Sequence, residues 1–137
     1  MPTTHRLRKH ADYQLVYKAG RKQFSKQIGY FYALRPALGP NGKPRRSDTS
    51  GARIGLTVPK ALGGAVDRNR IKRRMREAVR HQLPLLTAAV DVVLHPRRTV
   101  LELEFKLLER EVAQIFRSVQ SACNRAAEQA ANRAAQP

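Results

Sequence analysis

Residues 65–83 constrain the fold more than any other part of the chain, because their apolar positions recur at helical intervals within a basic segment. One side carries four apolar residues, Ile71, Met75, Ala78 and Val79, followed by Gln82. These positions fall at i, i+4, i+7, i+8 and i+11, the spacing of one helix face. The segment follows two glycines and stops before Pro84. The sequence therefore predicts an amphipathic helix that packs through one side.

Short apolar runs stand on both sides of this helix. The run RIGLTV at 53–58 ends at Pro59, and the run VDVVLH at 90–95 ends at Pro96. Both are typical of strands that stop at a residue unable to continue a ladder. A strand, a crossover helix and a second strand predict a βαβ unit within one mixed sheet, with helices packed on a face.

The rest of the chain adds two helices and two strands. Residues 8–20 predict a helix that ends at Gly20, and alternation over 27–34 predicts a strand with a shorter one at 21–24 before it. Residue 104 to about residue 125 predicts a core helix. Its apolar stripe is Leu107, Leu108, Val112, Ile115, Phe116 and Val119. The expected order is helix, two or three strands, helix, strand, helix, the short strand at 21–24 being the one left open.

The chain has 137 residues, which predicts one domain. We expect that domain to span 1–125. The segment 36–51 is rich in Pro and Gly and is expected to be a flexible loop insertion. Residues 126–137 are rich in Ala and offer little to bury, so we expect a frayed extension or tail.

The positive charge is concentrated before the last helix. The chain carries 27 Lys plus Arg against 10 Asp plus Glu, a formal net charge of +17. Residues 1–98 hold the whole excess, whereas 99–137 are neutral overall. A charge that served solubility alone would spread over the surface. This asymmetry indicates an anion-binding surface and leaves the C-terminal helix to packing.

RNA is the polyanion that the basic helix favours. Its cations are mostly arginines, which bind phosphate through two hydrogen bonds or stack on an unpaired base. An ordinary solvated helix face is the plain alternative, but such faces interleave Glu with Lys more evenly. A membrane-surface helix is the other alternative, although the apolar side lacks Trp, Phe and Leu and is needed for the core.

Several classes are excluded or disfavoured. No run approaches the roughly 18 apolar residues of a membrane span. The single Cys123 allows neither an internal disulfide nor a multi-thiolate zinc site. We see no secretory signal and expect a cytoplasmic protein.

A nuclease with its own active site would need a general acid and base or carboxylates that hold Mg²⁺. The four histidines lie in separate elements, and no paired-carboxylate motif appears: they are His5, His10, His81 and His95. We therefore expect no catalytic residue and no metal site on the protein. A ribosomal or other structural RNA-binding protein fits the charge and size equally well.

Three segments resemble one family. The stretch RIGLTVPKALGGAVDRNRIKRRMREAVR at 53–80 resembles the signature of the bacterial ribonuclease P protein component, with an Arg-Asn-Arg block that opens a basic helix. LRKHADYQLVYKAGRK at 7–22 resembles its first helix, and DVVLHPRR at 91–98 its last strand. The resemblance covers most of residues 6–98 in the expected order.

The resemblance implies an α/β fold of the αβββαβα type, like the ribosomal S5 domain 2, with a mixed sheet and a left-handed βαβ crossover. It implies a protein that binds ribonuclease P RNA and precursor tRNA and assists removal of the 5′ leader. In that family the chemistry belongs to the catalytic RNA and its Mg²⁺ ions. We expect a monomer in a 1:1 complex with the RNA.

The resemblance also implies roles for single residues. The Arg-Asn-Arg block and its neighbours are expected to contact the catalytic RNA: Arg68, Asn69, Arg70, Lys72, Arg73 and Arg76. The leader is expected to cross a cleft between the first helix and the sheet. The residues expected there are Tyr13, Tyr17, Phe31, Arg53 and Lys60.

The two tyrosines stand where the family usually has Phe, and their i, i+4 spacing puts both on one helix face. Tyr13 and Tyr17 are expected to stack on leader bases, the alternative being that both are core aromatics. Which face of strand 27–34 lines the cleft stays open, because a shift of one residue exchanges Phe31 for Tyr30 and Tyr32. Pro59 departs from the family pattern, and the loop looks longer than usual.

Overall fold

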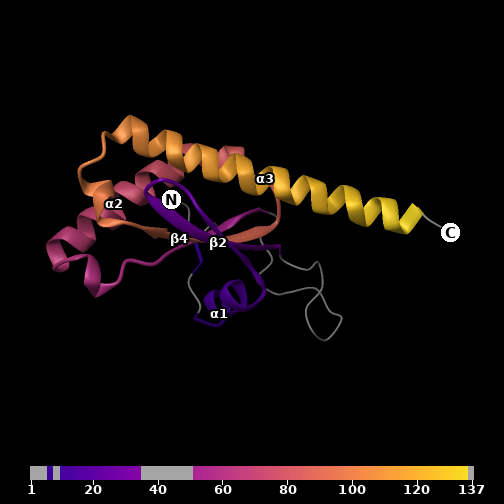
Figure 1. Ribbon diagram of the computed structural model, residues 1–137, viewed down its shortest axis with the longest axis horizontal. Coiled ribbons are helices and arrows are strands. Elements are labelled where there is room, and N and C mark those ends of the chain that lie inside the picture. The colour runs from indigo at the N-terminus through magenta and orange to yellow at the C-terminus, as the bar shows by residue number, and fades with distance from the viewer. Residues whose placement is uncertain (1–5, 8–9, 35–50, 136–137) are drawn as a thin grey trace.

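The structure is a computed structural model that describes residues 6–7, 10–34 and 51–135. Its elements follow the predicted order (Figure 1). They are α1 (His10–Ala19), β1 (Arg21–Phe24), β2 (Ile28–Leu34), β3 (Arg53–Leu56), α2 (Ala65–Gln82), β4 (Val90–Pro96) and α3 (Phe105–Ala135). Three short 3-10 helices, η2 (Lys60–Leu62), η3 (Leu83–Leu85) and η4 (Arg98–Leu101), lie between them. The expected loop insertion lies outside the described residues except for Gly51.

The four strands form one mixed sheet in the order β1-β2-β4-β3. β1 and β2 form an antiparallel hairpin, β2 pairs antiparallel with β4, and β3 pairs parallel with β4. The chain passes from β3 to β4 through α2, which confirms the predicted βαβ unit and the mixed α/β class. The handedness of this crossover stays a prediction. Arg6 adds a parallel bridge to Ile54, so it continues the sheet beyond β3.

Helices cover the two faces of the sheet unequally. Figure 1 shows α1 alone on one face, and α2 and α3 on the other. The main core lies on the α2 and α3 side, where Val92 and Leu94 of β4 meet Ile71 and Phe116. Val93, which points the other way, joins a smaller cluster beneath α1. The α1 face of the sheet is therefore only partly covered.

The register settles which face of β2 meets α1. Phe31 packs against the α1 cluster, whereas Tyr30 is buried in the main core and Tyr32 packs against that core. The period of two residues along a strand fixes this alternation once one residue is placed. The expectation that Phe31 faces the first helix is therefore the correct alternative.

Three details of the helix and strand predictions are wrong. The last helix continues to Ala135, beyond the expected end near 125, because no Gly or Pro occurs there before Pro137 and Ala favours helix. Leu107, placed on the apolar stripe, is 44% exposed, whereas the other five positions are buried. β3 ends at Leu56 rather than at residue 58, and only one hydrogen bond, from the Thr57 amide to the Leu94 carbonyl, extends its pairing.

Among the described residues, no helix has the length and apolar character needed to cross a membrane.

Candidate RNA interface

α2 separates its apolar and its basic side chains. Ile71, Met75, Ala78 and Val79 are buried against the main core. The seven cations occupy the rest of the helix surface: Arg68, Arg70, Lys72, Arg73, Arg74, Arg76 and Arg80. Only Asp67 and Glu77 oppose them on the same helix. The helix is thus anchored on one side and positively charged on the others.

Three of these arginines have partners within the protein. The Arg68 Nε donates to the Gly63 carbonyl at 3.2 Å. Arg74 donates from Nε to the Val100 carbonyl at 3.0 Å and from a terminal nitrogen to the Leu103 carbonyl. Arg80 forms an exposed ion pair with Glu77. Arg74 in particular links α2 to η4 and the segment that follows it.

The remaining four cations have no such partner. Within the described residues, the side chains of Arg70, Lys72, Arg73 and Arg76 make no hydrogen bond and no ion pair. Together with Asn69 they form a surface that we call the α2 basic face. Like charges at this spacing repel one another, which costs a few tenths of a kcal/mol per pair. An anionic partner would offset that repulsion.

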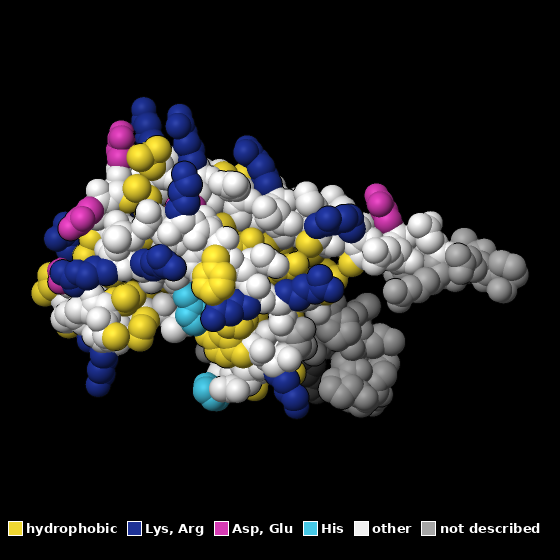
Figure 2. Space-filling model, viewed as in Figure 1, with side chains coloured by type: hydrophobic (Ala, Val, Ile, Leu, Met, Phe, Trp, Pro, Cys, Tyr) yellow, Lys and Arg dark blue, Asp and Glu magenta, His cyan; other side chains and the backbone are white. Residues whose placement is uncertain are grey.

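Arg76 lies near a second cation, Arg6. Partial burial lowers the pKa of the Arg76 guanidinium, and the positive charge of Arg6 lowers that pKa further. Arg6 comes from the segment that precedes α1, so two distant parts of the chain bring cations together here. The space-filling view shows Lys and Arg side chains predominating over Asp and Glu across one whole side of the molecule (Figure 2).

A cleft of about 330 Å³ opens on the part of the sheet that α1 leaves uncovered. We call it the α1 cleft, and it is lined by Tyr17, Lys22, Phe24, Gly29, Tyr30, Phe31, His95 and Arg97. The Tyr17 and Phe31 rings meet edge to face with centroids 4.9 Å apart. The Lys22 Nζ lies 5.0 Å from the Phe24 ring centroid and 5.6 Å from that of Phe31. Aromatic surface and positive charge therefore share one cleft.

Gly29 lies between two residues that line the cleft. It pairs with both Phe24 and His95 across the sheet, and the Phe24 ring lies within van der Waals reach of the position that a Cβ on Gly29 would occupy. Phe24 itself is 65% exposed. Because this large apolar ring is already exposed, a base could stack on it without any conformational change of the protein.

A polar network fixes the Tyr17 ring at the side of the cleft. Its hydroxyl lies 3.1 Å from the Thr57 Oγ1 and 3.1 Å from the His95 Nε2. Burial, and next the charge of Lys22, lower the pKa of His95. The imidazole is therefore neutral at pH 7, and it orients Tyr17 by a hydrogen bond between uncharged groups.

Tyr13 does not share this cleft with Tyr17. Its hydroxyl donates to the Leu7 carbonyl at 3.3 Å and accepts from the Leu56 amide at 3.2 Å. Its ring lies against Gly55, where an added Cβ would come within 2.8 Å of it. Helical spacing placed both tyrosines on the sheet side of α1, but the two rings enter different cavities. Tyr13 joins α1 to β3 and to the segment before α1.

Arg53 and Lys60 are placed very differently. Arg53 is 7% exposed, and it donates to the two carboxylate oxygens of Asp91 at 2.9 and 2.8 Å and to Asp12 at 3.4 Å. This geometry turns the guanidinium inward. Lys60 begins η2 and is exposed, but it does not line the α1 cleft.

Sequence reasoning missed five residues of the α1 cleft, namely Lys22, Phe24, Gly29, His95 and Arg97. The first two could have been found from the hairpin, because Lys22 pairs with Phe31 and Phe24 with Gly29. His95 and Arg97 depend on the pairing of β2 with β4 across more than 60 residues of chain, for which no local signal exists.

Among the described residues, no three His, Cys, Asp or Glu side chains are grouped so as to hold a metal ion.

Comparison with known proteins connects the chain to one family. The family model described as Ribonuclease P matches residues 1–120. A protein of Finegoldia magna named "Ribonuclease P protein component" is 33% identical, over 82% of this chain and 88% of its own length. One of the same name from Desulforapulum autotrophicum is 34% identical, over 86% and 91%.

Solved structures agree in fold. The RNase P protein of Staphylococcus aureus superposes with a TM-score of 0.66 at 23% identity, over 85% of this chain and 95% of its own. That of Thermotoga maritima gives a TM-score of 0.66 at 22% identity, over 82% and 96%. At these identities the structures support the mixed α/β fold alone.

Proposed function

Because this chain belongs to the ribonuclease P protein family, we propose that it binds the catalytic RNA through the α2 basic face and the 5′ leader of precursor tRNA in the α1 cleft. The shape and chemistry of each surface match the RNA that we assign to it. One is a convex helix with several unpaired cations, and the other is a concave aromatic site. The observation that carries the proposal is the set of four α2 cations without a protein partner among the described residues.

The α2 basic face suits a structured RNA. Its cations project from a rigid helix, so they can meet several phosphates at fixed spacing without ordering a loop. Arg70 and Arg73 are exposed, and arginine binds phosphate bidentately. Asn69 adds an amide that can donate to a phosphate or a base edge. Arg68 is already bonded to Gly63 and contributes charge near the start of the helix.

The α1 cleft suits a single strand. Unpaired bases can stack on Phe24, Phe31 and Tyr17, each stack being worth about 1 to 3 kcal/mol. Lys22 and Arg97 stand at the same cleft and can meet the phosphates between those bases. A paired helix could not present its bases in this way. Lys60, which lies outside the cleft, is proposed to contact a phosphate of the leader.

Tyr13 and Arg53 support this site indirectly. Arg53 joins β3 to β4 and α1 through Asp91 and Asp12, and Tyr13 holds α1 against β3. Both therefore position the helix that forms one wall of the cleft. We do not assign either of them to direct contact with the leader.

The cleavage chemistry is assigned to the RNA subunit, as the family implies. Mg²⁺ held mainly by that RNA would supply the activated water and the charge stabilisation of phosphodiester cleavage. The protein binds and positions the substrate, as a monomer in a 1:1 complex with the RNA in the cytoplasm.

The test is cleavage of precursor tRNA at low Mg²⁺ by a purified bacterial ribonuclease P RNA, with and without this protein, and by the protein alone. We expect rescue only when both subunits are present. Cleavage by the protein alone would overturn the assignment of the chemistry to RNA. Failure to rescue, together with tight binding to ribosomal RNA, would favour a structural RNA-binding role.

A further inference from the structure

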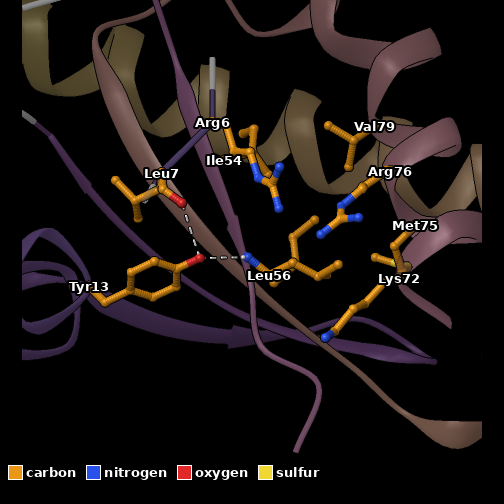
Figure 3. A pocket seen from close by; sticks show the side chains of 10 residues that line it. Arg6, Leu7, Tyr13, Ile54, Leu56, Lys72, Met75, Arg76 and Val79 are labelled. Carbon is orange, nitrogen blue, oxygen red and sulfur yellow. Dashed lines mark hydrogen bonds between the residues drawn. The ribbon is translucent and has the colours of Figure 1, made fainter. Parts of the chain in front are cut away.

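A second cavity, of about 370 Å³, lies at the outer edge of β3, apart from the α1 cleft. We call it the β3-edge pocket. Three segments that are distant in sequence form it: the residues before α1, the edge strand β3, and α2 (Figure 3). Its apolar wall is formed by Leu56 and the Tyr13 ring, both half-buried. Beneath this wall lie buried residues of the two cores: Leu7, Ile54, Met75, Val79 and Leu94.

Hydrogen bonds within the protein form the floor of the pocket, so the floor exists without a ligand. The Tyr13 hydroxyl bonds to the Leu7 carbonyl and to the Leu56 amide (Figure 3). The Leu7 amide in turn donates to the Ile54 carbonyl at 2.9 Å. The segment before α1 is thereby fastened to β3, and the space beside Leu56 is held open by bonded backbone.

Three cations stand at the rim of this apolar wall. In Figure 3, Arg6, Lys72 and Arg76 point toward the same space from two sides. None of the three side chains has an ion pair or hydrogen bond to another described residue. Arg6 and Arg76 are close enough for the charge of one to disfavour that of the other. An anion bound at this rim would offset the repulsion among the three cations.

We propose that the β3-edge pocket receives one unstacked nucleotide of RNA, with its base against the apolar wall and its phosphates between Arg6, Lys72 and Arg76. The inference rests on the proposed RNA-binding function and adds a site to it. Lys72 and Arg76 belong both to this rim and to the α2 basic face. A strand that follows the face therefore arrives at the pocket.

The shape and chemistry of the pocket favour a nucleotide over other anions. Its volume is near the lower end of the range for small-molecule sites, roughly 300 to 1,000 Å³, which suits one base and not a helix. Inorganic phosphate would use the cations and leave the apolar wall wet. Stacked bases of a duplex could not reach that wall. A base supplies the flat apolar surface, and its phosphates supply the charge.

The methionines provide a direct probe. The chain has two, Met1 and Met75, and Met75 lines the pocket. Protein with ¹³C-labelled methionine methyl groups therefore reports on the pocket through one internal resonance. We would titrate it with a single-stranded hexanucleotide, with a duplex RNA and with inorganic polyphosphate, which carries charge but no base.

We expect the single strand to move the Met75 methyl resonance by the ring current of a base. Polyphosphate and duplex are expected to bind the α2 basic face without that shift. Arg6→Ala should weaken the single-strand affinity read at Met75 about fivefold at 0.1 M salt, from a slope of roughly 0.7 per phosphate. Arg110→Ala is the matched control, an exposed cation on α3, and should leave it unchanged.

The same label in the complex with the RNA subunit separates the two sources of RNA. A shift on adding the RNA subunit alone assigns the nucleotide to the catalytic RNA, and a shift only after precursor tRNA is added assigns it to the substrate. An equal shift with polyphosphate, or saturation by RNA without any shift, would overturn the inference. If the protein rescued cleavage but the Met75 methyl resonance did not shift, the proposed function would stand and this nucleotide site would be refuted.

Discussion

The seven cations of α2 should separate into two groups when they are replaced one at a time. Arg73 makes no bond to the described protein, so Arg73→Ala removes only charge available to RNA. Arg74 is bonded to two backbone carbonyls of the segment after β4. Arg74→Ala leaves those carbonyls without their donor and removes a link between α2 and η4. The same substitution thus acts on binding in one case and on folding in the other.

The magnitudes follow from these contacts. One phosphate contact contributes a slope of about 0.9 in log K against log salt. Its loss in Arg73→Ala should weaken RNA binding about eightfold at 0.1 M salt and about fourfold at 0.2 M, from the same slope. Hydrogen bonds to a charged group are worth about 1.5 to 3 kcal/mol each. Because Arg74 is only partly buried, we expect Arg74→Ala to cost about 2 kcal/mol of unfolding free energy.

The assay is filter binding to ribonuclease P RNA between 0.05 and 0.4 M monovalent salt, paired with urea unfolding of each variant. Arg73→Ala should lower the salt slope by about one and leave the unfolding midpoint in place. Arg74→Ala should move the midpoint and keep the slope. If both variants changed the salt slope equally, the division of the α2 cations into RNA-binding and protein-bonded groups would be refuted.

Three further outcomes follow from the described contacts. Tyr17→Ala should weaken binding of precursor tRNA by about 1 to 3 kcal/mol and spare mature tRNA; equal losses for both would remove the stacking role. Because the pKa of His95 is lowered in the fold, the unfolded chain binds the proton more readily, so the unfolding free energy should fall as pH drops below about 6.5. His95→Gln should flatten that dependence between pH 5 and 8, and an unchanged slope in urea titrations would contradict the assignment. Arg53→Ala removes two hydrogen bonds and an opposite charge from the buried Asp91 carboxylate and should cost about 3 kcal/mol in thermal or urea unfolding. A stable variant that lost only precursor affinity would instead favour a direct contact with the leader.

The elements with a clear period were predictable from the sequence. The helix over residues 65–83 and its packed face follow from spacing alone, and the structure confirms the helix and four of the five face positions. The fifth position, Gln82, is only half-buried. The strands beside it end at or near prolines, as expected. The end of α3 was missed because alanine-rich sequence continues a helix without burying anything. Helix ends are predicted from Gly and Pro, and neither residue occurs between position 125 and Pro137.

The faces of the candidate site were harder to predict. Tyr30, Phe31 and Tyr32 are equivalent by composition, and only pairing with β4 decides that Phe31 meets α1. A helical projection likewise puts Arg73 on the basic side of the helix and Arg74 at its rim, but it does not say which of them bonds to the protein. Their difference arises from carbonyls of Val100 and Leu103, which lie 26 and 29 residues further along the chain. Roles set by distant partners are invisible to local patterns.

The sheet explains how one small domain could serve two RNA ligands at once. Successive residues of β4 point to opposite faces, so His95 reaches the α1 cleft while Leu94 packs on the core that anchors α2. The two surfaces are therefore separated by one layer of backbone. A change that shifts β4 by one residue would exchange these side chains and damage both sites together. A change confined to the side chains of one face should disturb only one of them. Independence of Tyr17→Ala and Arg73→Ala in a double-mutant cycle is the expected result, and a coupling energy well above about 0.5 kcal/mol would show that the layer transmits strain between the two ligands.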